Sequence, residues 1–269
     1  ANPNITWEST AMTNIGFDAT LFSKLSVTAE YYVKNTSDIL LKLPIPGTSG
    51  LNPAYQNAGK VRNKGWDITL RYNDRIGDFE YGIGVNLSDV HNEITDLAET
   101  GPYIYDRTIH KEGYPITSLY GLEAEGLFQN EDEIKDHASQ FGTILAPGDI
   151  KYKDQLTIDS DGDGIMDKTD GVINADDRVI MGDYMPHYTY GIDFYGKYKN
   201  IDLSFLLQGV GKADGYIDQQ GVLAFYMGGT AQEWHKDHWT EDNRNASYPR
   251  LTFNYPNNEQ VSSYWIRNA

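Results

Sequence analysis

The sequence predicts an all-β protein: a segment of an antiparallel transmembrane β-barrel, with short turns on the periplasmic side and long loops on the extracellular side. Three observations lead to this prediction. Apolar and polar residues alternate with a period of two along several segments, as in strands whose two faces differ. These segments run for about 10 to 12 residues, whereas an ordinary strand has about five or six. Very short and very long connections alternate between them, which is the layout of an outer-membrane barrel.

Six strands are expected, near residues 11–22, 25–36, 62–73, 78–88, 187–198 and 201–210. Each carries apolar side chains on one face and polar side chains on the other. We expect lipid to contact the apolar set, represented by Val27, Ile68, Val85 and Phe205. We expect the lumen to be lined by the polar set, represented by Glu30, Asp67 and Asn86. Aromatic residues near the strand ends are expected to form an interfacial girdle, namely Tyr31, Tyr32, Trp66 and Tyr72.

The connections are expected to differ on the two sides of the sheet. Short turns are predicted at Ser23–Lys24, at "NDRIG" (residues 73–77) and at Lys199–Asn200. Long connections are predicted at residues 37–61, at 89–186 and after residue 209, with a short helix near 130–141. A soluble β-sandwich shows the same alternation of side chains, so the pattern alone leaves both architectures open.

Composition excludes several classes of protein. The 269 residues include no cysteine, which rules out disulfide scaffolds and thiolate metal sites. The formal net charge of -17 makes nucleic acid an improbable partner, because affinity for nucleic acid comes from neutralising phosphates. The same charge attracts divalent cations. No apolar run approaches the roughly 18 residues that a membrane helix needs.

The segment "DSDGDGIMDKTD", residues 159–170, has the spacing of an EF-hand-type calcium loop. The expected ligands, through side chains or, at Ile165, the backbone carbonyl, are Asp159, Asp161, Asp163, Ile165, Asp167 and Asp170. Gly164 allows the sharp turn, and Asp170 stands where the usual bidentate Glu would be. Because the flanks are strand-like, a structural Ca²⁺ that stiffens a long loop is expected rather than a sensor. A solvated acidic loop remains the alternative.

No catalytic constellation is expected. The sequence contains no nucleophile elbow and no phosphate-binding glycine loop. The stretch "EWHKDHW", with His235 and His238, is expected to be a polar surface loop rather than a zinc site. Trp234 and Trp239 would pack in the interior or stack on sugar rings, and packing is favoured. The protein is therefore not expected to be an enzyme.

Several segments, in order, resemble one family over nearly the whole chain. They include "NPNITWESTAMTNIGFDATLF", "NAGKVRNKGWDITL", "KEGYPITSLYGLEAEGLFQNEDEI", "PGDIKYKD" and "DDRVIMGDYMPHYTYGIDFYGKYKNIDLSFLLQGVG", followed by "WTEDN" and "PRL". Together they resemble the carboxy-terminal third of SusC/RagA-type TonB-dependent outer-membrane transporters of Bacteroidetes. The sequence shows no plug or TonB box, and it stops at "SSYWIRNA", where the family continues. We therefore expect a portion of such a transporter.

The resemblance implies a location, a function and partners. It implies part of a large, plugged barrel in the outer membrane, in contact with lipid, that imports glycan or peptide nutrients. A SusD-like surface lipoprotein would cap the barrel, and TonB would act through parts of the protein outside this chain. The alternative function is a secreted, calcium-stabilised β-domain that binds glycans.

Overall fold

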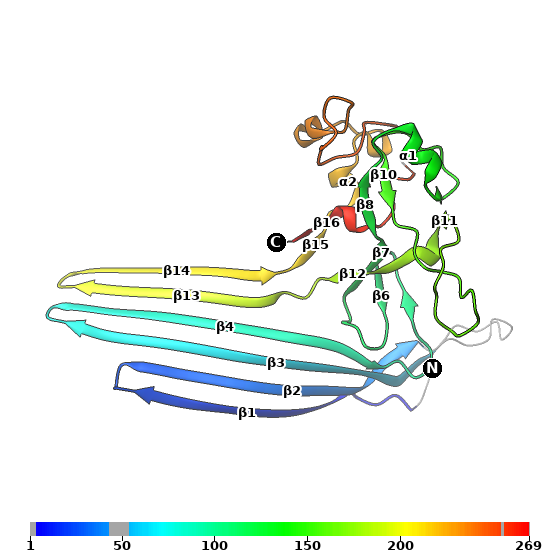
Figure 1. Cartoon of the computed structure of the whole chain (residues 1–269). Coiled ribbons are helices and arrows are strands. Elements are labelled where there is room, and N and C mark those ends of the chain that lie inside the picture. Colours follow the sequence, from blue (N-terminus) through cyan, green and yellow to red (C-terminus); the bar gives the residue numbers. More distant parts are fainter. Residues whose placement is uncertain (1–3, 43–53, 254–255, 269) are drawn as a thin grey trace.

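The computed structural model describes residues 4–42, 54–253 and 256–268. A sheet of long strands carries a cap that stands at one end of it (Figure 1). Among the described residues, no helix is long and apolar enough to span a bilayer.

The long strands form one antiparallel sheet of six. They are β1 (Ser9–Leu21), β2 (Leu25–Lys42), β3 (Tyr55–Ile76), β4 (Phe79–Asp96), β13 (His187–Tyr198) and β14 (Ile201–Lys212). The order is β1-β2-β3-β4-β13-β14, and every neighbouring pair is antiparallel. A sandwich would bury the apolar face against a second sheet. Here Ile68 and Phe205 are 38% and 49% exposed, so the sandwich alternative is not supported.

Several strands extend beyond their predicted bounds. β2 continues to Lys42, β3 starts at Tyr55, and β4 runs to Asp96. Alternation of apolar and polar residues stops before these points, but backbone pairing between strands does not require it. The described part of the connection predicted at residues 37–61 is therefore mostly strand, and residues 43–53 lie outside the described residues.

Two of the short turns are also shifted. The predicted "NDRIG" turn is wrong, because β3 continues to Ile76 and the turn is Gly77–Asp78. Ile76 pairs directly with Phe79, and Gly77 has a φ of 60°. The first turn includes Phe22 as well as the two predicted residues, since β1 ends at Leu21. The Lys199–Asn200 turn lies where the sequence places it.

Strand register gathers like side chains into rows across the sheet. One row on the apolar face runs Ala19, Val27, Leu70, Val85, Ile192, Leu207. The adjacent row on the opposite face runs Thr20, Ser26, Arg71, Gly84, Asp193, Leu206. The face predicted to be polar is therefore polar across five strands, and Leu206 on β14 departs from the pattern.

Three of the four predicted girdle residues share the apolar face. Tyr31 pairs with Trp66, and Tyr72 lies six residues further along β3 on the same side. Tyr32 does not belong with them, because neighbouring residues of a strand point to opposite faces. Its ring lies over Gly65, where an added Cβ would come within 2.4 Å of the ring carbon Cζ.

The cap consists of short strands and helical turns. One four-stranded sheet has the order β12-β7-β6-β5 and is made of β5 (Tyr103–Ile104), β6 (Thr108–His110), β7 (Ser118–Leu122) and β12 (Arg178–Asp183). Three strand pairs complete it: β8 (Ala124–Leu127) with β10 (Ile150–Tyr152), β9 (Ser139–Gln140) with β11 (Val172–Ile173), and β15 (Asp214–Tyr216) with β16 (Ile266–Asn268).

Helices in the cap are short. They are α1 (Glu131–Asp136) and α2 (Gln219–Val222), with 3₁₀ turns at Ala175–Asp177, Tyr226–Gly228, Glu233–Asp237 and Ser263–Trp265. In α1, Asn130 caps the first turn by accepting a hydrogen bond from the Glu133 backbone N–H at 2.8 Å. The helix predicted at 130–141 is half that long, because the chain enters β9 at Ser139.

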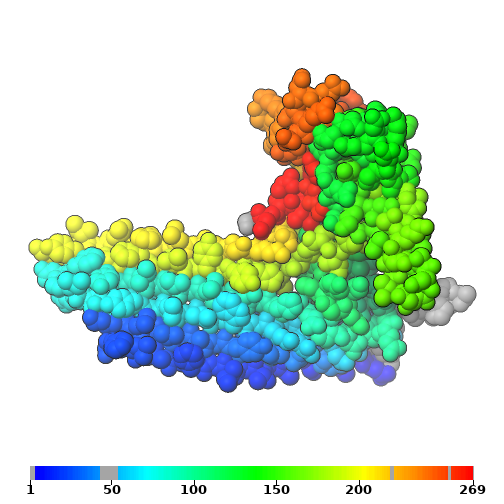
Figure 2. Space-filling model, viewed as in Figure 1, coloured from blue at the N-terminus to red at the C-terminus, as the bar shows by residue number. Residues whose placement is uncertain are grey.

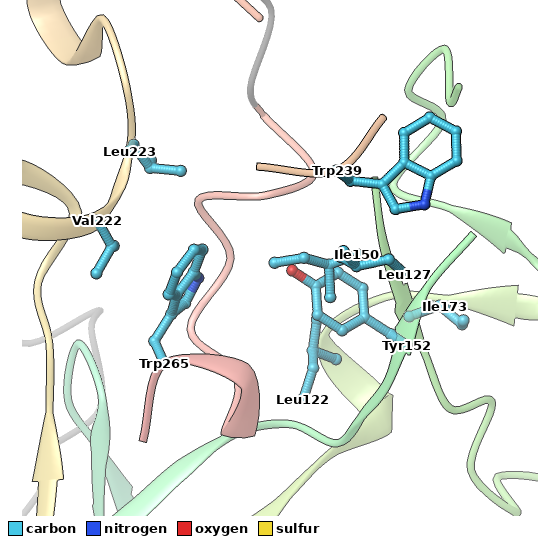
Figure 3. Packing of buried hydrophobic residues seen from close by; sticks show 9 residues of the cluster. All are labelled: Leu122, Leu127, Ile150, Tyr152, Ile173, Val222, Leu223, Trp239 and Trp265. Atoms are coloured by element: carbon cyan, nitrogen blue, oxygen red, sulfur yellow. The ribbon is translucent and has the colours of Figure 1, made fainter. Parts of the chain in front are cut away.

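Two distant segments share the core of the cap. One segment is residues 89–186 and the other is residues 213–268. The first contributes the buried side chains of Leu122, Leu127, Ile150, Tyr152 and Ile173, and the second contributes those of Val222, Leu223, Trp239 and Trp265. Figure 3 shows these side chains gathered from both segments, and Figure 2 shows the green and the orange-to-red parts of the chain together in the cap. Residues 89–186 are thus not a loop region alone, since residues 213–268 complete the same unit.

Polar side chains join the two segments inside this core. Gln140 Nε2 donates to Asn257 Oδ1 at 2.7 Å, and the Tyr152 hydroxyl donates to the Asn257 carbonyl at 2.7 Å. Trp265 Nε1 donates to the Asn258 carbonyl at 3.0 Å. These buried groups are therefore satisfied across the junction of the two segments.

The cap rests on the polar face of the long sheet. Asn92 and Ile94 lie on the same side of β4 as Asn86, and they are 6% and 2% exposed. Asn92 Oδ1 accepts a hydrogen bond from the Ile116 N–H at 2.8 Å, and the Ile94 N–H donates to the Tyr114 carbonyl at 2.9 Å. The apolar face has no such cover among the described residues.

Candidate functional site

The acidic loop brings three carboxylates together at its tip. Ligand oxygens of Asp159, Asp161 and Asp163 all lie within 4.8 Å of one another. The backbone curls around Asp159, whose carboxylate accepts hydrogen bonds from the N–H groups of Gly162 at 2.7 Å and Gly164 at 2.8 Å. Both glycines have a φ near that of the left-handed region, 80° and 89°, which glycine adopts without a steric penalty. The turn thus brings three alternate Asp residues of the expected ligand set together.

The other expected ligands are placed differently. Asp167 accepts hydrogen bonds from the Ser160 N–H at 2.9 Å and the Ser160 hydroxyl at 2.6 Å. Asp170 accepts one from the Val172 N–H at 2.8 Å and lies outside the three-carboxylate group. Ile165 follows the group directly, and its N–H donates to Asp163 at 2.8 Å.

Hydrogen bonds hold two carboxylates of the loop in their charged form. The pKa of Asp159 is lowered, chiefly by the backbone N–H groups of Gly164 and Gly162. The pKa of Asp167 is lowered by the Ser160 hydroxyl and then by its N–H. Donors that bond to a carboxylate favour its ionised state. The tip therefore presents negative charge at neutral pH, which suits a hard cation.

Asp154, which the sequence reasoning missed, lies at the base of the loop. Its Oδ2 accepts from the Gly171 N–H at 3.0 Å, while its Oδ1 is buried without a hydrogen-bond partner among the described residues. Its pKa is raised by burial and then by the nearby carboxylates of Asp177 and Asp170. Asp177 itself is fully buried and accepts from the N–H groups of Gln155 and Asn174, both at 2.8 Å. Asp177 therefore joins the two ends of the loop, because it binds the backbone at Gln155 before the loop and at Asn174 after it.

The histidines and tryptophans near residue 235 serve the packing of the cap. His235 is 3% exposed, and its Nε2 lies 2.9 Å from the Val222 carbonyl. His238 Nδ1 lies 2.8 Å from the His235 carbonyl. Trp239 is 7% exposed and belongs to the core, as predicted, whereas Trp234 is 46% exposed. Interior packing, which was favoured for both tryptophans, therefore holds for Trp239 but not for the exposed Trp234, and the alternative of stacking on a sugar stays untested.

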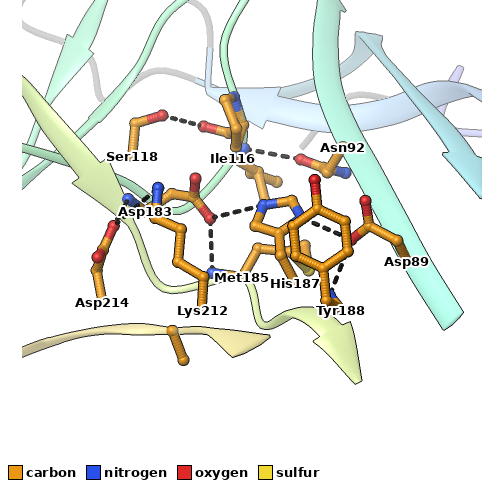
Figure 4. Close-up of polar contacts among 12 residues, drawn as sticks. Asp89, Asn92, Ile116, Ser118, Asp183, Met185, His187, Tyr188, Lys212 and Asp214 are labelled. Carbon is orange, nitrogen blue, oxygen red and sulfur yellow. Dashed lines mark hydrogen bonds and ion pairs between the residues drawn. The ribbon is translucent and has the colours of Figure 1, made fainter. Parts of the chain in front are cut away.

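A cluster of charged groups joins the cap to the long sheet (Figure 4). His187, at the start of β13, has Nδ1 at 2.7 Å from Asp89 Oδ1 on β4 and Nε2 at 4.0 Å from Asp183 Oδ1 at the end of β12. Asp214 accepts from the Asp183 N–H at 3.2 Å, and Lys212 Nζ lies 3.8 Å from Asp214. Five strands meet at this cluster, namely β4, β12, β13, β14 and β15, so it fixes where the cap stands on the sheet.

Charges also line the polar face below the cap. Arg71 on β3 and Asp193 on β13 approach to 3.5 Å across Gly84 of β4. An added Cβ at Gly84 would lie 2.1 Å from Asp193 Oδ1, so glycine leaves the space in which the two side chains meet. Arg75 and Glu80 form a second pair at 3.2 Å. Such a face is suited to water rather than to lipid.

Comparison with known proteins gave relatives among receptors and transporters. No family model matches the chain. It is 30% identical over 267 residues to TonB-dependent receptor P26 of Formosa agariphila, covering 93% of this chain and 25% of that protein. TonB-dependent receptor P3 of the same organism is 28% identical, again over 93% of this chain and 25% of the relative. The chain thus spans about a quarter of the length of the curated relatives that it matches, and these relatives are not enzymes.

Solved structures show the same fold. The RagAB peptide importer in the open-open state matches 99% of this chain and 27% of its own chain, with a TM-score of 0.74 and 24% identity. The closed-closed state gives a TM-score of 0.70 and 24% identity, over 99% of this chain and 28% of that chain. The long sheet and the cap therefore have the architecture of one part of a transporter barrel.

Proposed function

This chain is homologous to TonB-dependent receptors, and on that premise we propose that it forms six barrel strands and the extracellular cap of an outer-membrane nutrient importer. The observation that carries the proposal is the difference between the faces of the sheet. One face presents rows such as Val27, Leu70 and Val85, and the other presents exposed ion pairs and is covered by the cap at one end. A wall between lipid and an aqueous lumen needs both faces.

The partners follow from the family resemblance and from the position of the cap. A SusD-like surface lipoprotein would close over the outer end of the barrel, where the cap stands. TonB would act through parts of the protein outside this chain. The cargo would be a glycan or a peptide, and the structurally similar RagAB is described as a peptide importer.

Deletion of the encoding gene tests import. In a defined medium, the deletion strain is expected to lose uptake of either labelled oligosaccharides or labelled oligopeptides, and the intact gene should restore it. A variant of the full-length protein that cannot engage TonB should not restore uptake. Unchanged uptake of both cargo classes, with the protein shown to be present in the wild-type outer membrane, would contradict the proposal.

For the acidic loop we propose one structural Ca²⁺, bound by Asp159, Asp161, Asp163 and Asp170, with the Ile165 carbonyl and Asp167 or water completing the ligands. The three carboxylates already grouped at the tip support this. Asp170 would have to exchange its bond to the Val172 N–H for the ion. A dissociation constant on the order of 10⁻⁴ M is typical of extracellular sites. Calcium about 100-fold above that value would stabilise the folded loop by about 2.7 kcal/mol.

Calorimetry on the full-length protein in detergent tests the calcium site. Calcium titrated into chelator-treated protein should give a saturable heat, and Asp161→Ala, which removes the ligand oxygens, should abolish it. Asp132→Ala is the matched control, because Asp132 is an exposed carboxylate of α1 whose ion pair among the described residues is with Lys135. If the wild-type protein gives no heat of binding, the loop is a solvated charge cluster.

A further inference from the structure

One face of the cap sheet β12-β7-β6-β5 is hollowed. The hollow has a volume of about 460 Å³ and lies over all four strands, lined by Pro102, Ile104, Ile109, Lys111, Tyr114, Tyr120, Arg178, Val179 and Ile180. Its floor is apolar: Ile104 pairs with Ile109, and Ile180 pairs with Tyr120. Its volume falls within the range of about 300 to 1,000 Å³ that small-molecule sites occupy.

Arg178 is unusual among the arginines of the chain. Among the described residues, its buried Nε has no hydrogen-bond partner and its guanidinium forms no ion pair. Five other arginines form ion pairs, namely Arg62, Arg71, Arg75, Arg107 and Arg250. Arg244 and Arg267 donate to backbone carbonyls. A guanidinium stays charged at any physiological pH, and a buried donor without an acceptor is costly. Arg178 thus lacks an acceptor in a chain whose net charge is -17.

Nearby carboxylates are already in use. Asp177, adjacent to Arg178, accepts from two backbone N–H groups, those of Gln155 and Asn174. Glu112, adjacent to Lys111, accepts from the Leu97 N–H at 2.7 Å. Lys111 Nζ lies 5.3 Å from the centre of the Tyr114 ring at the edge of the hollow. Among the described residues, no carboxylate forms an ion pair with Arg178 or Lys111, the two cations that line the hollow.

We propose that this hollow binds a carboxylate attached to an apolar body. The carboxylate pairs with the two Nη groups of the Arg178 guanidinium, which are not among the buried atoms and match its two oxygens. The body lies on the isoleucines and on the faces of Tyr114 and Tyr120, which offer apolar area with a polar tip. The assignment of this ligand as cargo rests on the proposed import function, since the cap covers the lumen face of the sheet.

Binding of N-acetyl-L-leucine to the full-length protein in detergent, measured by calorimetry, tests the proposal. The amide, N-acetyl-L-leucinamide, has the same body without the charge and should bind at least tenfold more weakly. Arg178→Gln should weaken binding of the acid at least tenfold and reduce the preference for acid over amide. Arg244→Gln, which alters a cap arginine outside the hollow, should leave both affinities unchanged.

Three outcomes would overturn the site. The first is equal affinity of the wild-type protein for the acid and the amide, and the second is retention of wild-type affinity by Arg178→Gln. The third is a structure of the full-length protein in which another segment places a carboxylate on Arg178. If Arg178→Gln does not fold, Arg178→Lys is the second variant. It keeps the positive charge but lacks the planar guanidinium that binds both carboxylate oxygens, so it should still bind N-acetyl-L-leucine more weakly. Binding is measured without transport, so failure here leaves the import proposal standing, and failure of import leaves the binding result standing.

Discussion

Single carboxylates in the cap are satisfied to very different degrees. Asp149 is 2% exposed and accepts from Arg250 Nε at 2.8 Å, Asn258 Nδ2 at 2.9 Å and the Ala146 N–H at 2.9 Å. Asp154 has one buried oxygen without a partner among the described residues. An ionised carboxylate that is removed from water needs hydrogen-bond donors. We therefore expect Asp149 to stabilise the cap and Asp154 to destabilise it.

Asp154→Asn is therefore expected to stabilise the cap at pH 7. The pKa of Asp154 is raised in the folded state above its usual value of 3.8, so ionisation of this carboxyl opposes folding. The penalty is complete above the folded-state pKa. It decreases as the pH falls below that value and is absent below 3.8, where the carboxyl is protonated in both states. The gain should be present at pH 7 and absent near pH 3. It can be measured from the thermal midpoint of tryptophan fluorescence, since Trp239 and Trp265 lie in the cap core.

Asp149→Asn is the matched comparison, and it should lower the midpoint at pH 7, because it removes the charge that pairs with Arg250. A lower midpoint for Asp154→Asn as well would show that its carboxylate has a partner that stabilises it.

At the scale of elements, two hairpins of the long sheet use the same kind of turn with different residues. Gly77 and Lys199 each occupy the first position of a two-residue turn, with φ of 60° and 52°. Glycine is preferred at this position when φ is positive, and other residues lose roughly 1 kcal/mol or more in that conformation.

Lys199→Gly is thus expected to stabilise the β13–β14 hairpin, because it removes a conformational cost of roughly 1 kcal/mol. Part of this gain is offset, because glycine also increases the conformational entropy of the unfolded chain. Gly77→Lys should destabilise the β3–β4 hairpin by a similar amount. Urea unfolding of the full-length protein in detergent gives both shifts. Destabilisation by Lys199→Gly would mean that the lysine side chain, which lies 5.2 Å from the Tyr198 ring centre, contributes more than the turn conformation costs.

The long strands could be predicted from the sequence because their alternation reports on two different environments. Each predicted strand exists, and residues such as Val27, Ile68 and Val85 share a face across the sheet. Strand ends could not be predicted, since pairing continues where apolar and polar residues no longer alternate, as between Arg62 and Glu93. The tip of the acidic loop was also predictable, because Asp spacing and glycine positions determine it locally.

The interior of the cap could not be predicted in the same way. Its strands have two to six residues, too few to show a period. Its core depends on contacts such as that between Gln140 and Asn257, which are 117 residues apart. Asp154 and Arg178 give no sequence signal either, because what distinguishes them is the absence of a described partner for one buried atom each.

For the molecule as a whole, the apolar face of the long sheet carries exposed hydrophobic side chains, such as Ile68, Leu70 and Phe205. Leu70→Arg would place a charge in the row formed by Val27 and Val85. We expect it to cost about 2 to 4 kcal/mol in the membrane and to reduce the amount of folded protein in the outer membrane, measured by heat-modifiable migration on gels.

Thr69→Arg provides the control, because Thr69 is the next residue on the same strand and points to the opposite face, beside Thr28 and Asn86. It should assemble normally. If Leu70→Arg assembled as well as Thr69→Arg, the apolar face would not be in contact with lipid.

The shared core of the cap also constrains how the last hairpin can slide. β13 follows β12 out of the cap, and β14 leads directly into β15, which pairs with β16 next to Trp265. A slip of two residues would preserve the faces of the strands but move one end of the hairpin by about 7 Å relative to the other. That displacement would pull Trp265 away from Tyr152 and its neighbours. The cap therefore restricts the registry of β13 against β14, and its core is complete only after the residues near 265 have joined it.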